Sequence, residues 1–136
     1  MDRLDDVVET FELLGDWESR YAYLSELGEQ LPAIDEANKI EDNRVKACIS
    51  MVWVKAYQRQ KDQIHFQGEC DTAITKGVLA VLIQLVEGKT AAEVAQLDID
   101  LIFERLRLAD HLSPNRHVGI YAIVDLMKKQ VAAMIG

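Results

Sequence analysis

The chain has 136 residues and a mass of 15.4 kDa, and its 49% hydrophobic and 28% charged residues are typical of one soluble globular domain rather than a fibre, a disordered chain or a disulfide scaffold. Its net charge of −8 argues against a dedicated nucleic-acid binder. The longest apolar run, residues 78–83, is far shorter than the roughly 20 residues that cross a bilayer. Aspartates occupy the N-terminal positions at which a secretory signal peptide carries positive charge, so we expect a cytoplasmic protein.

Two amphipathic helices are predicted at the N-terminus. The first covers residues 3–14, and the second follows Asp16, a good N-cap, with Gly28 predicted just beyond its end. Residues 32–43 are polar and acidic without a clear period, so we expect a loop there. The apolar stripes of the two helices are Leu4, Val7, Val8, Phe11 and Leu14, and Trp17, Tyr21, Leu24 and Leu27.

A change to β-branched and aromatic residues from Val45 onward predicts antiparallel strands. The polar run 58–63 is typical of a hairpin turn, and 63–68 is expected to return as a strand with Ile64 and Phe66 facing inward. Two or three strands do not stand alone in water, so we expect helices packed on one face.

Four helices are predicted after the strands. Asp71 is the expected cap of the first, which ends at Gly88, and Thr90 with Glu93 fits a capping box for a short second. The third covers residues 98–108. The last starts at Ser113-Pro114 and runs to about Met134, and the residues expected to face inward are Val118, Tyr121, Val124, Met127 and Val131.

This order of elements predicts the fold class. Strands followed by a run of helices indicate an α+β domain, here a small antiparallel sheet of about three strands packed against several helices. The sequence has no repeat and no linker, so we expect a single domain over residues 1–136.

The two cysteines, Cys48 and Cys70, do not form a Cys-x-x-Cys motif, and the three histidines supply no regular zinc spacing. A structural disulfide is not expected in a chain without a secretion signal. Three roles stay open from the residues alone, namely buried filler, redox pair and reactive nucleophile.

The charge pattern singles out Cys48. Residues 1–43 carry thirteen Asp and Glu against three Lys and Arg, which predicts an acidic solvated surface on the N-terminal helices. Residues 44–62 are locally basic instead, and Arg44 and Lys46 directly precede Cys48. Because nearby cations stabilise a thiolate, a nucleophilic Cys48 is a hypothesis beside that of an inert buried thiol.

Residues 45–53, VKACISMVW, resemble the V-x-G-C-x-S-x-V-W signature of the SufE/CsdE family of sulfur acceptors for cysteine desulfurases. Three more blocks, in the family's order, extend the resemblance over almost the whole chain. They are Phe11, Trp17, Arg20, Tyr21, Leu24, Leu27, Gly28, Leu31 and Pro32; Asp71, Ala73, Ile74, Lys76 and Gly77; and HLSPNR at residues 111–116.

The resemblance implies a SufE/IscU-like fold and a role in iron–sulfur cluster assembly. A PLP-dependent cysteine desulfurase, of the SufS or CsdA type, forms a persulfide, and the acceptor takes its sulfur by thiol exchange. By motif position the acceptor is Cys48. The protein itself is expected to be an activator and carrier rather than an enzyme, with no cofactor or metal of its own because the partner holds the PLP. Sulfur then passes to an iron–sulfur scaffold or another acceptor, with no nucleic acid or membrane involved.

We expect the desulfurase to bind around Cys48 through Arg44, Lys46, Asp71 and Arg116. Asp71 and Arg116 lie in motif blocks at predicted helix starts, where loops expose side chains. The structural alternatives are that Asp71 only caps a helix and that Arg116 only pairs with an acidic helix.

The chain departs from the family pattern at three positions. Ala47 replaces a glycine, Asn115 replaces a serine, and Cys70 stands where a serine is usual. We expect Cys70 to be dispensable, although a disulfide or a metal pair with Cys48 stays open.

An IscU-type iron–sulfur scaffold is the alternative function. Its candidate ligands are Cys48, Cys70, Asp71 and His111. Cluster ligation favours several thiolates, whereas this chain has two cysteines. A plain interaction adaptor with inert cysteines is a third possibility.

Overall fold

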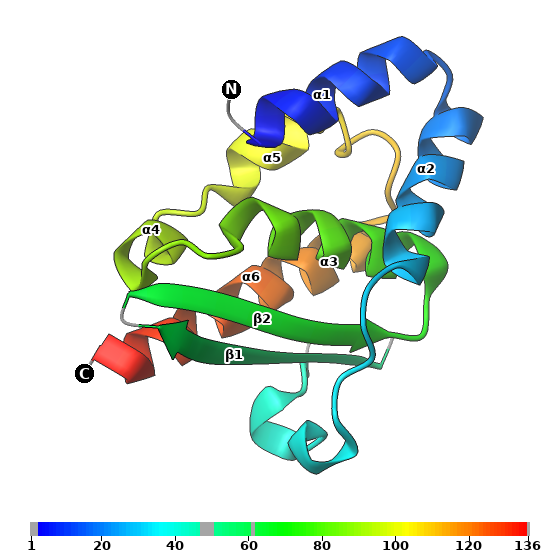
Figure 1. Cartoon of the computed structure of the whole chain (residues 1–136). Helices are drawn as coiled ribbons and strands as arrows, with labels where there is room; N and C mark the ends of the chain where they lie inside the picture. The colour runs from blue at the N-terminus through cyan, green and yellow to red at the C-terminus, as the bar shows by residue number, and fades with distance from the viewer. Residues whose placement is uncertain (1–2, 47–50, 61, 136) are drawn as a thin grey trace.

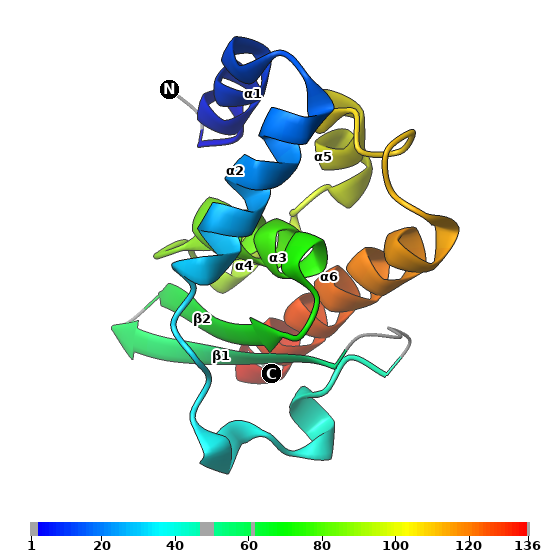
Figure 2. The same cartoon turned by 90° about the vertical axis from the view of Figure 1, so that its right-hand side faces the viewer.

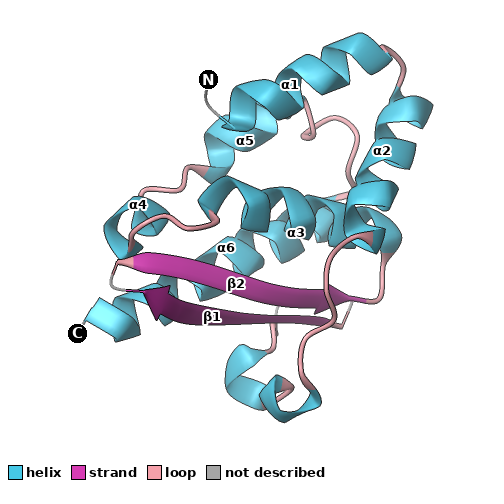
Figure 3. Ribbon diagram, in the orientation of Figure 1, coloured by secondary structure: helices cyan, strands magenta, loops and turns pink. Residues whose placement is uncertain are grey.

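The computed structural model describes residues 3–46, 51–60 and 62–135. Within these ranges six α-helices, two 3-10 helices and a two-stranded antiparallel sheet confirm the α+β class (Figures 1 and 3). The elements are α1 (Arg3–Leu14), α2 (Trp17–Glu29), η1 (Glu36–Asn38), η2 (Glu41–Asn43), β1 (Val52–Gln60), β2 (Gln63–Cys70), α3 (Ala73–Val86), α4 (Ala91–Ala95), α5 (Ile99–Leu106) and α6 (Pro114–Ile135). No helix in these ranges has the length and hydropathy needed to cross a membrane.

The two strands form a hairpin whose register pairs Val52 with Cys70 and Tyr57 with His65. β1 continues to Gln60 and β2 begins at Gln63, so the turn is shorter than the predicted run 58–63. Alternate side chains point to opposite faces of the sheet, and one face is buried. The buried residues of that face, which include the two predicted to face inward, are Val52, Val54, Ala56, Ile64, Phe66 and Cys70.

Within the described residues no third strand forms, and two isolated antiparallel bridges, Arg44 with Trp53 and Ile64 with Lys89, flank the hairpin instead. Further along β1, a side chain of α6 takes the place of a neighbouring strand. The backbone N–H of Ala56 donates to Oε1 of Gln130 at 2.9 Å, and Nε2 of Gln130 donates to the carbonyl of Val54 at 2.9 Å. Two backbone groups on the edge of β1 are therefore satisfied without a third strand.

The buried face of the sheet carries α3 over β2 and α6 over β1 (Figures 1 and 2). The segment with η1 and η2 is tied to the opposite face by side-chain contacts. Nδ2 of Asn38 donates to the hydroxyl of Tyr57 at 2.6 Å, and Nζ of Lys39 pairs with Glu69 at 2.7 Å. Burial raises the pKa of the Tyr57 phenol, and the nearby charge of Asp35 adds to the effect.

A close helix crossing joins α2 to α3. A Cβ atom on Gly77 would lie 2.2 Å from the carbonyl oxygen of Leu24, and one on Gly28 would lie 3.0 Å from the backbone nitrogen of Gly77. The prediction that Gly28 follows the end of α2 is wrong, because the helix continues to Glu29 and Gln30 is its C-cap. Gly28 lies inside the helix because the contact with α3 leaves no room for a side chain.

The predicted caps are confirmed at two helices and wrong at a third. Oδ1 of Asp16 accepts from the N–H of Ser19 at 2.8 Å, and Thr90 and Glu93 form the expected capping box. At α3 the N-cap is Thr72, without a side-chain cap, rather than Asp71. The side chain of Asp71 instead bonds to the residue that precedes β1.

The inward face of α6 is confirmed only over its C-terminal part. Val124, Met127 and Val131 are buried, whereas Val118 is 55% exposed and Tyr121 is 36% exposed. The first turns of α6 extend beyond the sheet, as Figure 2 shows. Tyr121 there stacks on Phe103 of α5 at 5.4 Å between ring centroids and leaves its outer side in solvent.

Candidate site around the segment that carries Cys48

Cys48, the expected sulfur acceptor, lies outside the described residues. The described residues closest to it along the chain are Lys46 and Met51, and both are exposed. Val45 and Val52, one position further out, are buried, and the N–H of Val45 donates to the carbonyl of Val52 at 2.9 Å. This hydrogen bond holds the two ends of the segment together at the start of β1.

Asp71 is bonded directly to that segment. Its Oδ1 accepts from the backbone N–H of Met51 at 3.0 Å, and its own N–H donates to the carbonyl of Met51 at 3.3 Å. The hydroxyl of Thr72 donates to the same Oδ1 at 3.3 Å. The exposed carboxylate is therefore bonded to Met51, which lies three residues from Cys48 along the chain, and helps to position the start of β1.

Arg44 and Lys46 share one carboxylate. Nη1 of Arg44 lies 3.7 Å from Oε1 of Glu41, and Nζ of Lys46 lies 3.9 Å from Oε2. Exposed pairs of this kind contribute about 1 kcal/mol or less, but they lower the local positive potential that was expected near Cys48. Glu41 was not among the residues predicted from the sequence, although its spacing of three residues from Arg44 is typical of an ion pair.

A groove of about 580 Å³ separates the chain around η2 from α6. Its walls carry charges of both signs, so the surface is mixed rather than basic as the sequence suggested. The charged residues that line it are Glu41, Asp42, Arg44, Lys46, Asp125 and Lys129.

Arg116 is exposed in the first turn of α6, where its backbone N–H donates to Oγ of Ser113 at 3.3 Å. Within the described ranges its guanidinium forms no ion pair, so the structural alternative for this residue is absent there. Arg116 and Asp71 make no hydrogen bond or ion pair with each other. The starts of β1, α3 and α6 nevertheless share the end of the molecule that faces the viewer in Figure 2.

Cys70 ends β2 and is only 7% exposed. It lies opposite Val52 in the sheet, and its Sγ accepts from the N–H of Thr72 at 3.5 Å. The thiol therefore lies beneath the same corner of the molecule as Asp71, but it points into the core.

His111, the histidine of the scaffold alternative, belongs to a different contact. Its ring stacks on Trp17 at 3.6 Å between centroids, and its carbonyl accepts from the hydroxyl of Tyr21 at 2.7 Å. The HLSPNR block thus meets the N-terminal block in a packing contact. Among the residues that the structure describes, no three His, Cys, Asp or Glu side chains gather where they could hold a metal ion.

Comparisons with known proteins agree with this arrangement. The SufE family, described as an Fe-S metabolism associated domain, matches residues 5–131. An uncharacterized SufE-like protein of Rhizobium meliloti (strain 1021) is 32% identical over 133 residues, which are 96% of this chain and 95% of that protein. A second, from Rhizobium etli, is 33% identical over 133 residues, 96% of this chain and 90% of its own length.

The solution structure of a hypothetical protein from Thermus thermophilus superimposes with a TM-score of 0.80 over 98% of this chain and 96% of that chain. At 19% sequence identity this likeness shows the shared fold. The family match and the two relatives show more, because they extend over nearly the whole sequence. The chain belongs to the SufE family and has a role in iron–sulfur metabolism.

Proposed function

We propose that the protein is a sulfur acceptor that takes persulfide sulfur from a PLP-dependent cysteine desulfurase of the SufS or CsdA type. It carries the sulfur on Cys48, stimulates the desulfurase, and passes the sulfur to an iron–sulfur scaffold or another acceptor. It acts as a carrier and not as an enzyme, and needs no cofactor or metal of its own. We expect the exchange to occur in the cytoplasm, where thiols are kept reduced.

The chemistry is a thiol exchange. The thiolate of Cys48 attacks the outer sulfur of the enzyme's persulfide, a new sulfur–sulfur bond forms at Cys48, and the enzyme's cysteine leaves as a thiolate. One sulfur–sulfur bond is made and one is broken, so the step needs no external oxidant or reductant. Its rate depends on the thiolate fraction of Cys48 and on access to it.

One observation carries the proposal. The match to the SufE family spans residues 5–131 and so includes the segment 45–53, whose cysteine is Cys48. Two features of the described residues support it further, namely the exposure of Lys46 and Met51 and the closure of the segment by Val45 and Val52.

The test is sulfur loading followed by mass spectrometry. After incubation with a cysteine desulfurase and free cysteine, the protein is expected to gain the mass of one or more sulfur atoms, which peptide mapping assigns to Cys48 and a reductant removes. The Cys48→Ala variant is expected to fold but neither to carry sulfur nor to accelerate the desulfurase. If that variant stimulates the enzyme as well as the unmodified chain does, the carrier mechanism is wrong and the protein acts by binding alone.

Reconstitution with iron and sulfide separates this function from an IscU-type scaffold. A carrier is expected to stay colourless, whereas a scaffold gives a brown, absorbing product because the cluster is held on several protein ligands. Cys70, Asp71 and His111 do not gather into a metal-binding group among the described residues, and Cys48 lies outside them, so the reconstitution is what distinguishes the two functions.

A further inference from the structure

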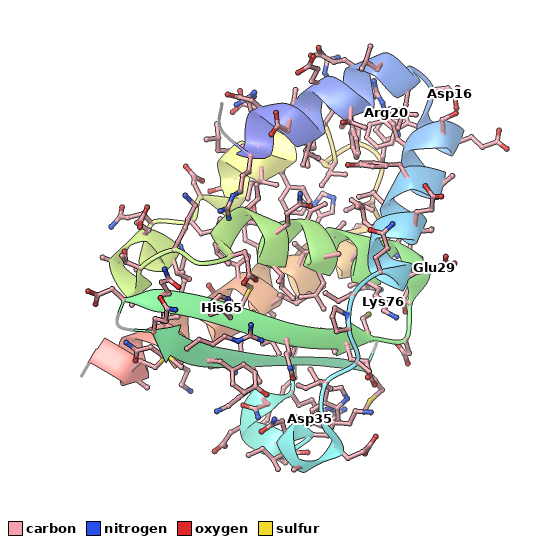
Figure 4. The ribbon with its side chains drawn as sticks, in the orientation of Figure 1. Asp16, Arg20, Glu29, Asp35, His65 and Lys76 are labelled. Atoms are coloured by element: carbon pink, nitrogen blue, oxygen red, sulfur yellow. The ribbon has the colours of Figure 1, made fainter. Side chains whose placement is uncertain are left out.

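Three arginines line a pocket formed by residues of α1, α2 and the end of α5. Figures 1 and 2 show that these helices lie away from the sheet. The volume of the pocket is about 280 Å³. Arg20 enters it from the first turn of α2, close to the corner between α1 and α2 (Figure 4), and Arg105 and Arg107 enter it from the end of α5. Glu12 is the one acidic residue among the described residues that line it.

The three guanidinium groups differ in how they are held. Nη2 of Arg105 pairs with Oδ1 of Asp5 at 2.6 Å, which fixes its direction and neutralises one charge. Nε of Arg20 donates to the carbonyl of Phe11 at 2.8 Å, and its guanidinium carbon lies 5.0 Å from the ring centroid of Trp17. These contacts orient Arg20 but leave its two terminal nitrogens as donors.

Within the described ranges, neither Arg20 nor Arg107 forms an ion pair with an acidic side chain. Asp16 directs its oxygens at Ser19, whose hydrogen bonds are the main cause of its lowered pKa, and the charge of Arg20 adds to that effect without an ion pair. The pocket therefore holds two guanidinium groups whose charge no described carboxylate pairs with.

The backbone of Arg107 adds an independent observation. It is the C-cap of α5 and adopts the left-handed conformation, with φ of 56° and ψ of 36°. A residue other than glycine there costs roughly 1 kcal/mol. A cation at a helix C-terminus is favoured by the helix dipole, which accounts for Arg107. The dipole of α5 does not explain why Arg20, which belongs to α2, lines the same pocket.

We propose that this pocket binds a small oxyanion, a phosphate or carboxylate group, between Arg20 and Arg107, with Arg105 as the third cation. The planar fork of a guanidinium matches two oxygens of either group and donates two parallel hydrogen bonds. The site shares no residue with the segment around Cys48, so it is independent of the sulfur-acceptor function.

The test is a titration of the full chain with inorganic phosphate, followed by NMR at constant ionic strength maintained with sodium chloride. Saturable shifts are expected at the amides around Phe11, Arg20 and Arg107. The Arg107→Gly variant is expected to weaken binding about tenfold or more, because it removes charge-assisted hydrogen bonds. This variant also relieves the left-handed backbone, so it retains the fold.

Arg59→Ala is the matched control, because Arg59 is an exposed arginine on β1, outside the pocket, and its removal changes the net charge equally. It is expected to bind phosphate as the unmodified chain does. A parallel titration with acetate distinguishes the ligand chemistry: saturation by both anions supports a general oxyanion site, and saturation by phosphate alone supports a phosphate-bearing ligand. Shifts that do not saturate, or that are equal in Arg107→Gly and Arg59→Ala, overturn the proposal.

Discussion

Two carboxylates determine much of what surrounds the segment that carries Cys48. Oδ1 of Asp71 accepts the backbone N–H of Met51 at 3.0 Å, and Glu41 lies within 4.0 Å of the charged groups of both Arg44 and Lys46. Asp71 holds the backbone at the start of β1 in place, whereas Glu41 lowers the positive electrostatic potential of Arg44 and Lys46. Each offers a separate way to test the proposed sulfur transfer without altering Cys48.

Charge reversal at Asp71 tests the expected partner surface. Asp71→Arg is expected to change stimulation of the desulfurase severalfold, while the free energy of unfolding falls by only about 1 kcal/mol, because the residue is exposed and water can replace the lost acceptor of the Met51 N–H. Desulfurase turnover and urea unfolding measure the two effects. Asp71→Asn is the control, since its carbonyl still accepts the N–H of Met51. If Asn changes stimulation as Arg does, the loss of the negative charge is responsible; if Asn behaves as Asp, the negative charge is not required and the partner-surface explanation for Asp71 fails.

Arg116→Glu is the corresponding charge reversal on α6. It is expected to change stimulation of the desulfurase while the free energy of unfolding stays close to that of the unmodified chain. Its side chain has no ion pair within the described ranges, so no internal contact is lost on reversal. A drop in stability with normal stimulation would assign either residue to the fold instead of the partner surface.

Cys70→Ser tests whether the second thiol matters. The variant is expected to accept sulfur at the rate of the unmodified chain, because the hydroxyl can accept the N–H of Thr72 as Sγ does. Placing a hydroxyl in this buried position costs about 1 kcal/mol of stability. Single-turnover sulfur loading, followed by mass spectrometry, gives the answer. A large loss of transfer, or a Cys48–Cys70 disulfide in mildly oxidised protein, would require a two-thiol mechanism.

At the scale of the elements, two contacts between distant segments hold the site in place. The crossing of α2 and α3 brings the backbone of Gly77 against Leu24, and Gln130 of α6 closes the edge of β1. Since β1 follows the segment with Cys48 and α3 follows Asp71, both contacts fix the elements on which the site depends.

Gly77→Ala is expected to destabilise the protein by about 2 kcal/mol, which is an overpacking cost of about 3 kcal/mol less the gain in helix propensity. Alanine gains about 1 kcal/mol in helix propensity, but a Cβ atom 2.2 Å from the carbonyl oxygen of Leu24 forces α2 and α3 apart, and overpacking of this kind outweighs that gain. Urea unfolding measures the loss. Gly88→Ala is the control: it meets no atom within 4 Å and only strains a φ of +73°, so it is expected to cost about 1 kcal/mol. Equal losses in both variants would refute the packing explanation.

At the scale of the whole molecule, the excess of acidic residues makes stability depend on pH. The chain carries 23 Asp and Glu, and the helix caps lower the pKa of two of them. The N–H and hydroxyl of Ser19 lower the pKa of Asp16, and the backbone N–H and hydroxyl of Thr90 lower the pKa of Glu93. A carboxyl with a lowered pKa stabilises the fold above its unfolded pKa, and this stabilisation is lost as the pH falls through the folded value.

Asp16→Asn isolates one of these contributions. Asparagine is a comparable N-cap but does not titrate, so the unmodified chain is expected to be the more stable at pH 7. The difference is expected to shrink as the pH falls below about 4, the unfolded pKa of aspartate. Thermal unfolding midpoints of both proteins between about pH 7 and about pH 2.5, values chosen to bracket that pKa, provide the comparison. A difference that stays constant with pH would show that the Asp16 carboxylate contributes nothing through its charge.

Features that depend on neighbouring residues could be predicted from the amino-acid sequence. The caps at Asp16 and at Thr90 with Glu93, the order of the elements and the α+β class all follow from patterns a few residues long. The signature around Cys48 likewise pointed to the family that the comparisons show. Such patterns are readable because their physics is local.

Contacts between segments far apart in the sequence could not be predicted from it and are visible only in the tertiary structure. Where a third strand was expected, Gln130, 74 residues after Ala56, bonds to two backbone groups on the edge of β1. Gly28 remains inside α2 because Gly77 packs against that helix, and Asp71 is bound to Met51, 20 residues earlier, instead of capping α3. In each case the neighbouring residues are compatible with the predicted structure. A residue far along the chain nevertheless offers a hydrogen bond or a packing contact that stabilises a different arrangement.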